Sequence, residues 1–133
     1  MLVGGKTSPS LHRILLAYHG QAHADEALAW TVQLQRDLSA EVVVLNVQES
    51  TESYKGGLDL EEIEDRLAKS GLDAYRFLTG RGRPYIEIAA IATANHVDLI
   101  VLGRYRHSTP VEWLAGSTVD RLLRATTLPM LIV

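Results

Sequence analysis

Short apolar runs alternate with segments of helical periodicity along most of the chain. Continuous runs rich in Val, Ile and Leu are typical of strands that are covered on both faces. Five such runs predict strands at Arg13–Tyr18, Glu41–Val47, Ala74–Thr79, Asp98–Leu102 and Leu128–Val133. The third run is the least apolar, so we expect that strand near an edge of the sheet.

Four segments between these runs carry apolar residues at helical spacing. The first spans Ala24–Leu38. The second begins at Asp59, which has a glutamate three residues later as in a capping box, and Gly71 suits its end. Pro84 suits the first turn of the third helix, and Ser117 can cap the fourth.

The alternation of strand and helix predicts a doubly wound α/β fold with a five-stranded parallel sheet and helices on both faces. One consistent strand order, numbered along the chain, is 3-2-1-4-5. This order reverses direction between the first and fourth strands, and ligands bind beyond the carboxyl ends of strands at such a point. The loops at residues 18–21 and 103–117 are therefore the candidate ligand loops. We expect one domain over residues 12–133, a flexible lead over residues 1–11, and a polar loop from Gln48 to Gly57.

Charge and composition exclude several classes of function. The chain has 133 residues and a net charge of −3, so nothing predicts nucleic acid or a membrane as a partner. The longest apolar runs are too short to span a bilayer. The chain contains no cysteine, which excludes disulfides, thiolate metal sites and a cysteine nucleophile. The absence of cysteine is also compatible with a reducing cytoplasm, where we expect the protein.

Two glycines frame the second candidate loop. Gly103 follows the fourth strand, and Gly116 comes thirteen positions later, directly before Ser117 and the last helix. A glycine after a strand allows a tight turn and a close approach to a ligand. A helix N-terminus attracts anions, and the Ser117 hydroxyl can donate to a phosphate. From the residues alone, an ordinary turn with an ordinary helix cap is an equal alternative.

The segment GRYRHSTPVEWLAGS resembles the nucleotide motif G-x2-G-x9-G-[S/T] of the universal stress protein family. The flanking DLIVL and LPMLIV, the first strand RILLAYHG and the segment RGRPYIEIAAIA resemble that family too. The resemblance covers the chain from His12 to Val133. It implies a stress-response binding or signalling module without catalytic residues or a certain cofactor, which could take ATP or AMP.

The resemblance also implies which residues would form the nucleotide site. Backbone groups of Val47 would meet the adenine, and His19 stands where nucleotide-binding members place an acidic residue near the ribose. Arg106 replaces the middle glycine of the motif, and its guanidinium could neutralise phosphates with the help of Arg104. The full set is His19, Val47, Gly103, Arg104, Arg106, Gly116 and Ser117. We therefore predict a degenerate adenine-nucleotide site.

Other chemistry is less well supported by the sequence. The chain has no P-loop pattern and no G-x-S-x-G elbow, and His19 and His23 lack a clear third partner for a metal site. The alternatives are a slow nucleotide hydrolase, with Asp25 as the nearest acidic candidate, and a flavin-binding electron carrier. Four arginines predict a basic rim at the carboxyl ends of the third and fourth strands, with solvated loop arginines as the equal alternative: Arg81, Arg83, Arg104 and Arg106.

The last predicted strand, Leu128–Val133, is apolar and carries no charge. In the predicted order it lies at an edge of the sheet, and a bare apolar edge favours pairing with another strand. Members of the family that the chain resembles often dimerise through this strand. We therefore expect a homodimer through Leu128–Val133.

Overall fold

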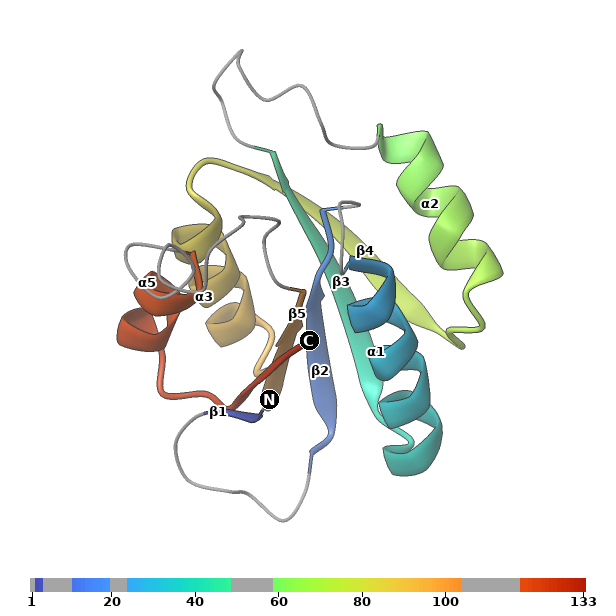
Figure 1. Ribbon diagram of the computed structural model, residues 1–133, viewed down its shortest axis with the longest axis horizontal. Helices are drawn as coiled ribbons and strands as arrows, with labels where there is room; N and C mark the ends of the chain where they lie inside the picture. The colour runs from blue at the N-terminus through green and yellow to red at the C-terminus, as the bar shows by residue number, and fades with distance from the viewer. Residues whose placement is uncertain (1, 4–10, 20–23, 49–58, 104–117) are drawn as a thin grey trace.

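The computed structural model describes residues 2–3, 11–19, 24–48, 59–103 and 118–133. Its strands form one six-stranded sheet in the order β1-β6-β5-β2-β3-β4 (Figure 1). The strands are β1 (Leu2–Val3), β2 (Arg13–Ala17), β3 (Glu41–Gln48), β4 (Tyr75–Arg81), β5 (Leu99–Leu102) and β6 (Met130–Ile132). The helices are α1 (Ala24–Leu38), α2 (Leu60–Lys69), α3 (Pro84–Ala94) and α5 (Thr118–Ala125).

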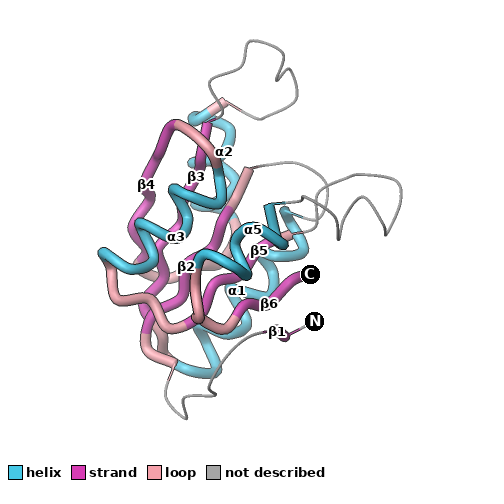
Figure 2. The backbone as a smooth tube through the Cα atoms, turned by 90° about the vertical axis from the view of Figure 1, so that its left-hand side faces the viewer, coloured by secondary structure: helices cyan, strands magenta, loops and turns pink. Residues whose placement is uncertain are grey.

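The five predicted strands pair in the predicted order. All four pairings among β2, β3, β4, β5 and β6 are parallel. With these strands numbered along the chain, the observed order is 3-2-1-4-5, so the predicted doubly wound fold is confirmed. The helices α1 and α2 cover one face, and α3 and α5 cover the other (Figures 1 and 2).

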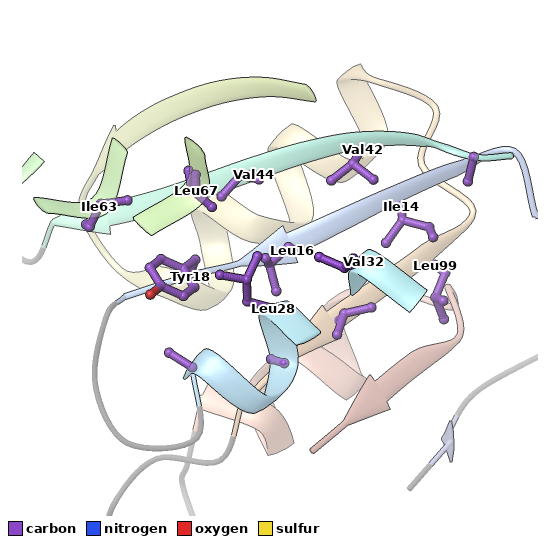
Figure 3. Close-up of a cluster of buried hydrophobic side chains, with 14 residues drawn as sticks. Ile14, Leu16, Tyr18, Leu28, Val32, Val42, Val44, Ile63, Leu67 and Leu99 are labelled. Carbon is purple, nitrogen blue, oxygen red and sulfur yellow. The ribbon is translucent and has the colours of Figure 1, made fainter. Parts of the chain in front are cut away.

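The two faces of the central strand β2 serve two separate cores. Leu16 belongs to the cluster formed with α1 and α2, whereas Leu15 belongs to the cluster formed with α3 and α5. Both side chains are fully buried. The alternation follows from the two-residue period of a strand, and the apolar run from Ile14 to Ala17 follows from burial on both faces. Figure 3 shows the first cluster, in which Leu16 lies between residues of β3 and α1.

The helix ends follow the predicted signals. The side chain of Asp59 caps α2 by accepting a hydrogen bond from Glu62 N, at 2.8 Å from Oδ1. Gly71 takes a φ of +93° just after α2, a conformation that costs glycine little. Pro84 is the first residue of α3. The predicted cap of the last helix, Ser117, lies outside the described residues.

The amino end of β2 is held by a carboxylate. Asp98 precedes β5, and its Oδ2 accepts from the backbone N–H groups of His12 (2.8 Å) and Arg13 (3.0 Å). The Arg13 side chain donates from Nε to Glu41 Oε2 (2.7 Å) and from Nη1 to Asn95 O (2.9 Å). The prediction started the fourth strand at Asp98, whereas β5 begins at Leu99; Asp98 N donates to Arg13 O at 2.9 Å just before the ladder begins.

The strand β1 was not predicted. Leu2–Val3 pairs antiparallel with β6, in the register Leu2↔Leu131 and Val3↔Met130. The predicted lead over residues 1–11 therefore contains a strand. We predicted that β6 would form an edge of the sheet, and in the described sheet this is wrong, because β1 lies outside it. A two-residue strand is too short to show a periodic pattern, so the sequence could not reveal it. Among the described helices, none has the length and hydropathy to cross a membrane.

Candidate functional site

The candidate site lies at the carboxyl ends of β2, β3 and β5. The ends of β2 and β5 are level, because Ala17 pairs with Leu102, whereas β3 continues past Leu45, the partner of Ala17, to Gln48. The chain leaves β2 for α1 on one face of the sheet, whereas the next helix described after β5, α5, lies on the opposite face (Figure 1). Neighbouring strands whose connections diverge in this way leave a crevice between them, which is where such folds bind ligands.

Backbone groups of Val47 and Gly103 face this crevice. Leu45 O accepts from Tyr18 N at 2.9 Å, so Leu45 turns its backbone groups toward β2. Val47, two residues further along the strand, points the same way, beyond the last residue of β2. Leu102 O accepts from Val133 N at 3.0 Å on the β6 side, so Gly103 turns its backbone toward β2. The crevice is thus bordered on both sides by main-chain donors and acceptors.

His19 stands between these two backbones, two residues beyond the end of β2. Its half-buried ring lies in a narrow pocket of about 20 Å³ that is otherwise mainly apolar, lined by Ala17, Tyr18, Leu45, Val47, Pro84 and Ile88. Burial lowers the pKa of the imidazole below its ordinary value of 6.5. At neutral pH the ring is therefore uncharged, with one nitrogen a donor and the other an acceptor, and its Nε2 is buried.

The lowered pKa of His19 predicts a loss of stability in acid. The unfolded chain binds a proton on this histidine more readily than the folded chain does, so the folded state loses stability as the pH falls below about 6.5. We expect His19→Gln to have a flatter pH profile of its free energy of unfolding between pH 7.5 and pH 5. Urea titrations measure this, with His12→Gln as a control that removes an exposed histidine outside the pocket. Equal pH profiles for the wild type and His19→Gln would contradict a lowered pKa of His19.

A hydrogen-bonded chain beside the site escaped the sequence analysis. Tyr18 Oη donates to Asp25 Oδ1 (2.8 Å), and Arg66 Nη1 lies 3.1 Å from Asp25 Oδ2. Burial, and next the bond to Asp25, raise the pKa of Tyr18. Figure 3 places Tyr18 at one end of the buried cluster. Asp25, the acidic candidate for a hydrolase, therefore has a structural task, which is to join β2 and α1 to α2.

Asn46 is the second residue that the sequence analysis missed. It is buried in β3, and its Nδ2 donates to Tyr18 O at 2.9 Å. This bond fixes the backbone immediately before His19 and therefore sets where the imidazole lies. The only signal in the sequence was a lone amide within the apolar run EVVVLNV. Asn46 is a positioning residue for the site.

The turn between β4 and α3 modifies the predicted basic rim. Arg81 and Arg83 are exposed on either side of Gly82, whose φ is +129°. The carboxylate of Glu87 packs against this turn, so that a Cβ on Gly80 would lie 3.2 Å from Glu87 Oε2. An acidic group thus partly balances the two arginines. The other predicted site residues, Arg104, Arg106, Gly116 and Ser117, lie outside the described residues.

A larger hollow lies at the opposite end of the sheet, at the amino ends of β2, β3 and β4. Its volume is about 310 Å³, and its polar lining includes Arg13, Glu41, Arg76 and Asn95. These side chains bond to one another or to nearby backbone, and Arg76 Nη1 donates to Asn95 Oδ1 at 3.2 Å. The hollow is therefore not our candidate ligand site. Within the described part of the chain, no three acidic, histidine or cysteine side chains gather as metal ligands would.

Comparisons with known proteins agree with the fold. The family model described as the universal stress protein family matches residues 10–133. A universal stress protein solved in complex with cAMP is 18% identical with a TM-score of 0.73, covering 93% of this chain and 97% of that one. UspA from Lactobacillus plantarum is 17% identical with a TM-score of 0.73, covering 95% and 99%.

A third solved structure, a universal stress protein from Archaeoglobus fulgidus, is 23% identical with a TM-score of 0.69. That match covers 90% of this chain and 42% of the longer archaeal chain. At these identities the likeness establishes the fold. Among curated proteins, none matches the sequence significantly.

Proposed function

This chain belongs to the universal stress protein family, and from that premise we propose that it is a stress-response binding module that holds an adenine nucleotide at the carboxyl ends of β2, β3 and β5. The observation that carries the proposal is the convergence of His19 with the backbones of Val47 and Gly103 at the point where the strand order reverses. A purine needs main-chain donors and acceptors at its edge, and a ribose hydroxyl needs a polar side chain. Among the described residues, Val47 and Gly103 supply the main-chain groups and His19 supplies the polar side chain.

The neutral imidazole of His19 sets the expected strength of binding. A carboxylate accepts a hydrogen bond from a hydroxyl group. Because the acceptor is charged, this bond is about twice as strong as a neutral one. His19 forms only the neutral kind, so the ribose is held less tightly than by an acidic residue. We propose that Gly103, Gly116 and Ser117 hold the phosphates together with Arg104 and Arg106. The neighbour solved with cAMP supports the choice of an adenine nucleotide.

Calorimetric titration with AMP and with ATP, each with and without magnesium, tests this proposal. We expect saturable binding of the wild type with a Kd below about 1 mM, equivalent to about −4 kcal/mol or stronger. We expect His19→Asp to bind about tenfold more tightly, because it restores an ionised acceptor for the ribose. A bulky residue in place of Gly116 should weaken binding.

The matched control is His12→Asp, which makes the same substitution at the exposed amino end of β2. It should bind like the wild type. Circular dichroism confirms that each variant is folded. No heat from any of these proteins up to 1 mM nucleotide would overturn the nucleotide site. An equal gain in nucleotide affinity from His12→Asp would show that the added negative charge acts on binding from outside the site.

Slow nucleotide hydrolysis is the alternative to simple binding. Asp25 is occupied by Tyr18 and Arg66, which favours a binding module over a hydrolase. A phosphate-release assay with ATP distinguishes the two. A binding module gives no release above a protein-free blank, whereas saturable release that is lost in Asp25→Asn would favour the hydrolase.

The cellular setting of this module is part of the same proposal. Family membership and the cysteine-free sequence support a role in the cytoplasm. Family membership also supports a homodimer joined through the C-terminal strand, formed when β1 is released from that strand. The strand β1 occupies the described edge of β6, so a second copy can pair there only after β1 leaves.

A further inference from the structure

The outer edge of β6 is paired with the chain's own N-terminal strand. Figures 1 and 2 show β1 beside β6, with the two ends of the chain on the same side of the sheet. Pro129 and Val133 flank β6 and turn their backbone groups toward β5, because Ile100 N donates to Pro129 O (3.0 Å) and Val133 N donates to Leu102 O (3.0 Å). By alternation, Met130 and Ile132 turn their backbone groups the other way, toward β1.

The pairing of β1 repeats the pairing that a second copy of β6 would make. A two-fold antiparallel pair of β6 strands centred on Leu131 would set Leu131 against Leu131 and Met130 against Ile132 of the second copy. In β1, Leu2 lies against Leu131 and Val3 against Met130. Leu2 therefore takes the place of the second copy's Leu131, and Val3 takes the place of its Ile132.

The sequence of β1 supports the same equivalence. The chain begins Met1-Leu2-Val3, and β6 reads Met130-Leu131-Ile132. The third position is a β-branched residue in both. An N-terminal segment that imitates β6 in order, register and residue type is what a substitute for a second copy requires.

We propose that β1 is an internal substitute for the C-terminal strand of a second copy, so that dimer formation through β6 requires β1 to be released. This inference rests on the homodimer proposed above. The chain length allows the intramolecular pairing: β1 lies three strand positions from β2, about 14 Å away at the usual spacing, and the ten steps from Val3 to Arg13 can reach about 33 Å. A short tether gives β1 an effective concentration of order millimolar, so it outcompetes a second copy at micromolar concentration.

The surface beside β6 suits a second copy of the chain. Asp25 and Gln35 of α1 bond to α2 and to the segment before β4, which fixes the flank of α1 that faces β3 and β4. Trp30 is 51% exposed, and it lies five residues from both Asp25 and Gln35, so helical spacing places it away from that flank. Leu131 and Val133 are only partly buried on the same face of the sheet. Pairing of two β6 strands would bring these apolar side chains from both copies together.

Two proline substitutions test the proposal as a matched pair. Alternation directs the backbone N–H of Val3 toward Met130 and that of Leu2 away from β6. Val3→Pro therefore removes a hydrogen bond to β6, whereas Leu2→Pro places the same residue where no such bond is lost. Sedimentation velocity from 1 to 100 µM measures the oligomeric state of each variant, of the full chain, and of a chain that lacks residues 2–9.

We expect the full chain and Leu2→Pro to be mainly monomeric at 10 µM. Val3→Pro and the truncated chain should dimerise with a Kd at least tenfold lower. Hydrogen exchange at the Met130 and Ile132 amides provides the second readout. Their protection should be independent of concentration in the full chain and should rise with concentration in the truncated chain.

Each other outcome overturns the inference in a distinct way. A full chain that is already dimeric at 1 µM, and whose dimerisation is unchanged by truncation, would mean that the dimer forms but that β1 does not control it. A truncated chain that stays monomeric at 100 µM, with both amides exposed, would remove the dimer as well. A dimer that weakens on truncation would mean that β1 strengthens association instead of blocking it. None of these outcomes bears on nucleotide binding, which calorimetry tests separately.

Discussion

Replacing Leu16 by alanine is expected to lower the free energy of unfolding by about 3–4 kcal/mol. Leu16 is fully buried at the centre of β2, where it pairs with Val44 on one side and Val101 on the other. Leu28 of α1 packs in the same cluster. Neighbours on three sides belong to the sheet and a helix, so they cannot collapse into the space that the shorter side chain leaves.

Urea unfolding followed by circular dichroism measures this loss. Leu38→Ala provides the matched control, because Leu38 ends α1 and is 41% exposed. The control should change the free energy of unfolding by less than about 0.5 kcal/mol. A loss below about 1.5 kcal/mol for Leu16→Ala would contradict the central place that we give to β2 in the core.

Replacing Asp98 by alanine is expected to cost about 2 kcal/mol, the second largest effect among our predictions. The carboxylate accepts from two backbone N–H groups at the entrance of β2, those of His12 and Arg13. Without it, the part-buried N–H of Arg13 loses its acceptor, and only the backbone bond from Asp98 N to Arg13 O still joins Asp98 to β2.

Asp98→Asn serves as the comparison, because its carbonyl oxygen can accept the same bonds without a charge. It should cost about half as much as the alanine variant. The same urea titrations measure both variants. Equal stability of the wild type and Asp98→Ala would show that the two bonds do not support the strand.

The sequence predicted the sheet well because each central strand carries a local signal. β2, β3 and β5 are continuous apolar runs, and burial on both faces is the reason for that composition. The ends of α2 were equally readable, since Asp59 and Gly71 act through their immediate neighbours. β1 could not be read in this way. Its two residues are stabilised by pairing with β6, which lies at the other end of the chain.

The candidate site was predicted in part for the same reason. His19 and Gly103 follow predicted strands and Val47 ends one, so topology alone brings them to one edge of the sheet. Asn46 and Glu87 were not foreseen. Each acts on a segment that is distant in the sequence or across a turn, Asn46 on Tyr18 O and Glu87 on Gly80 and Gly82. Contacts of that kind depend on packing and leave no periodic pattern in the sequence.

The most direct test of the central claim is a titration of ¹⁵N-labelled protein with AMP, followed through the backbone amide resonances. We predict saturable shifts of the His19, Val47 and Gly103 amides, which lie together at the carboxyl ends of β2, β3 and β5. The amides of Tyr75 and Asn95, at the hollow on the opposite end of the sheet, should stay in place. Shifts at Tyr75 and Asn95 with none at His19, Val47 and Gly103, or no shifts at all up to 1 mM AMP, would contradict our account.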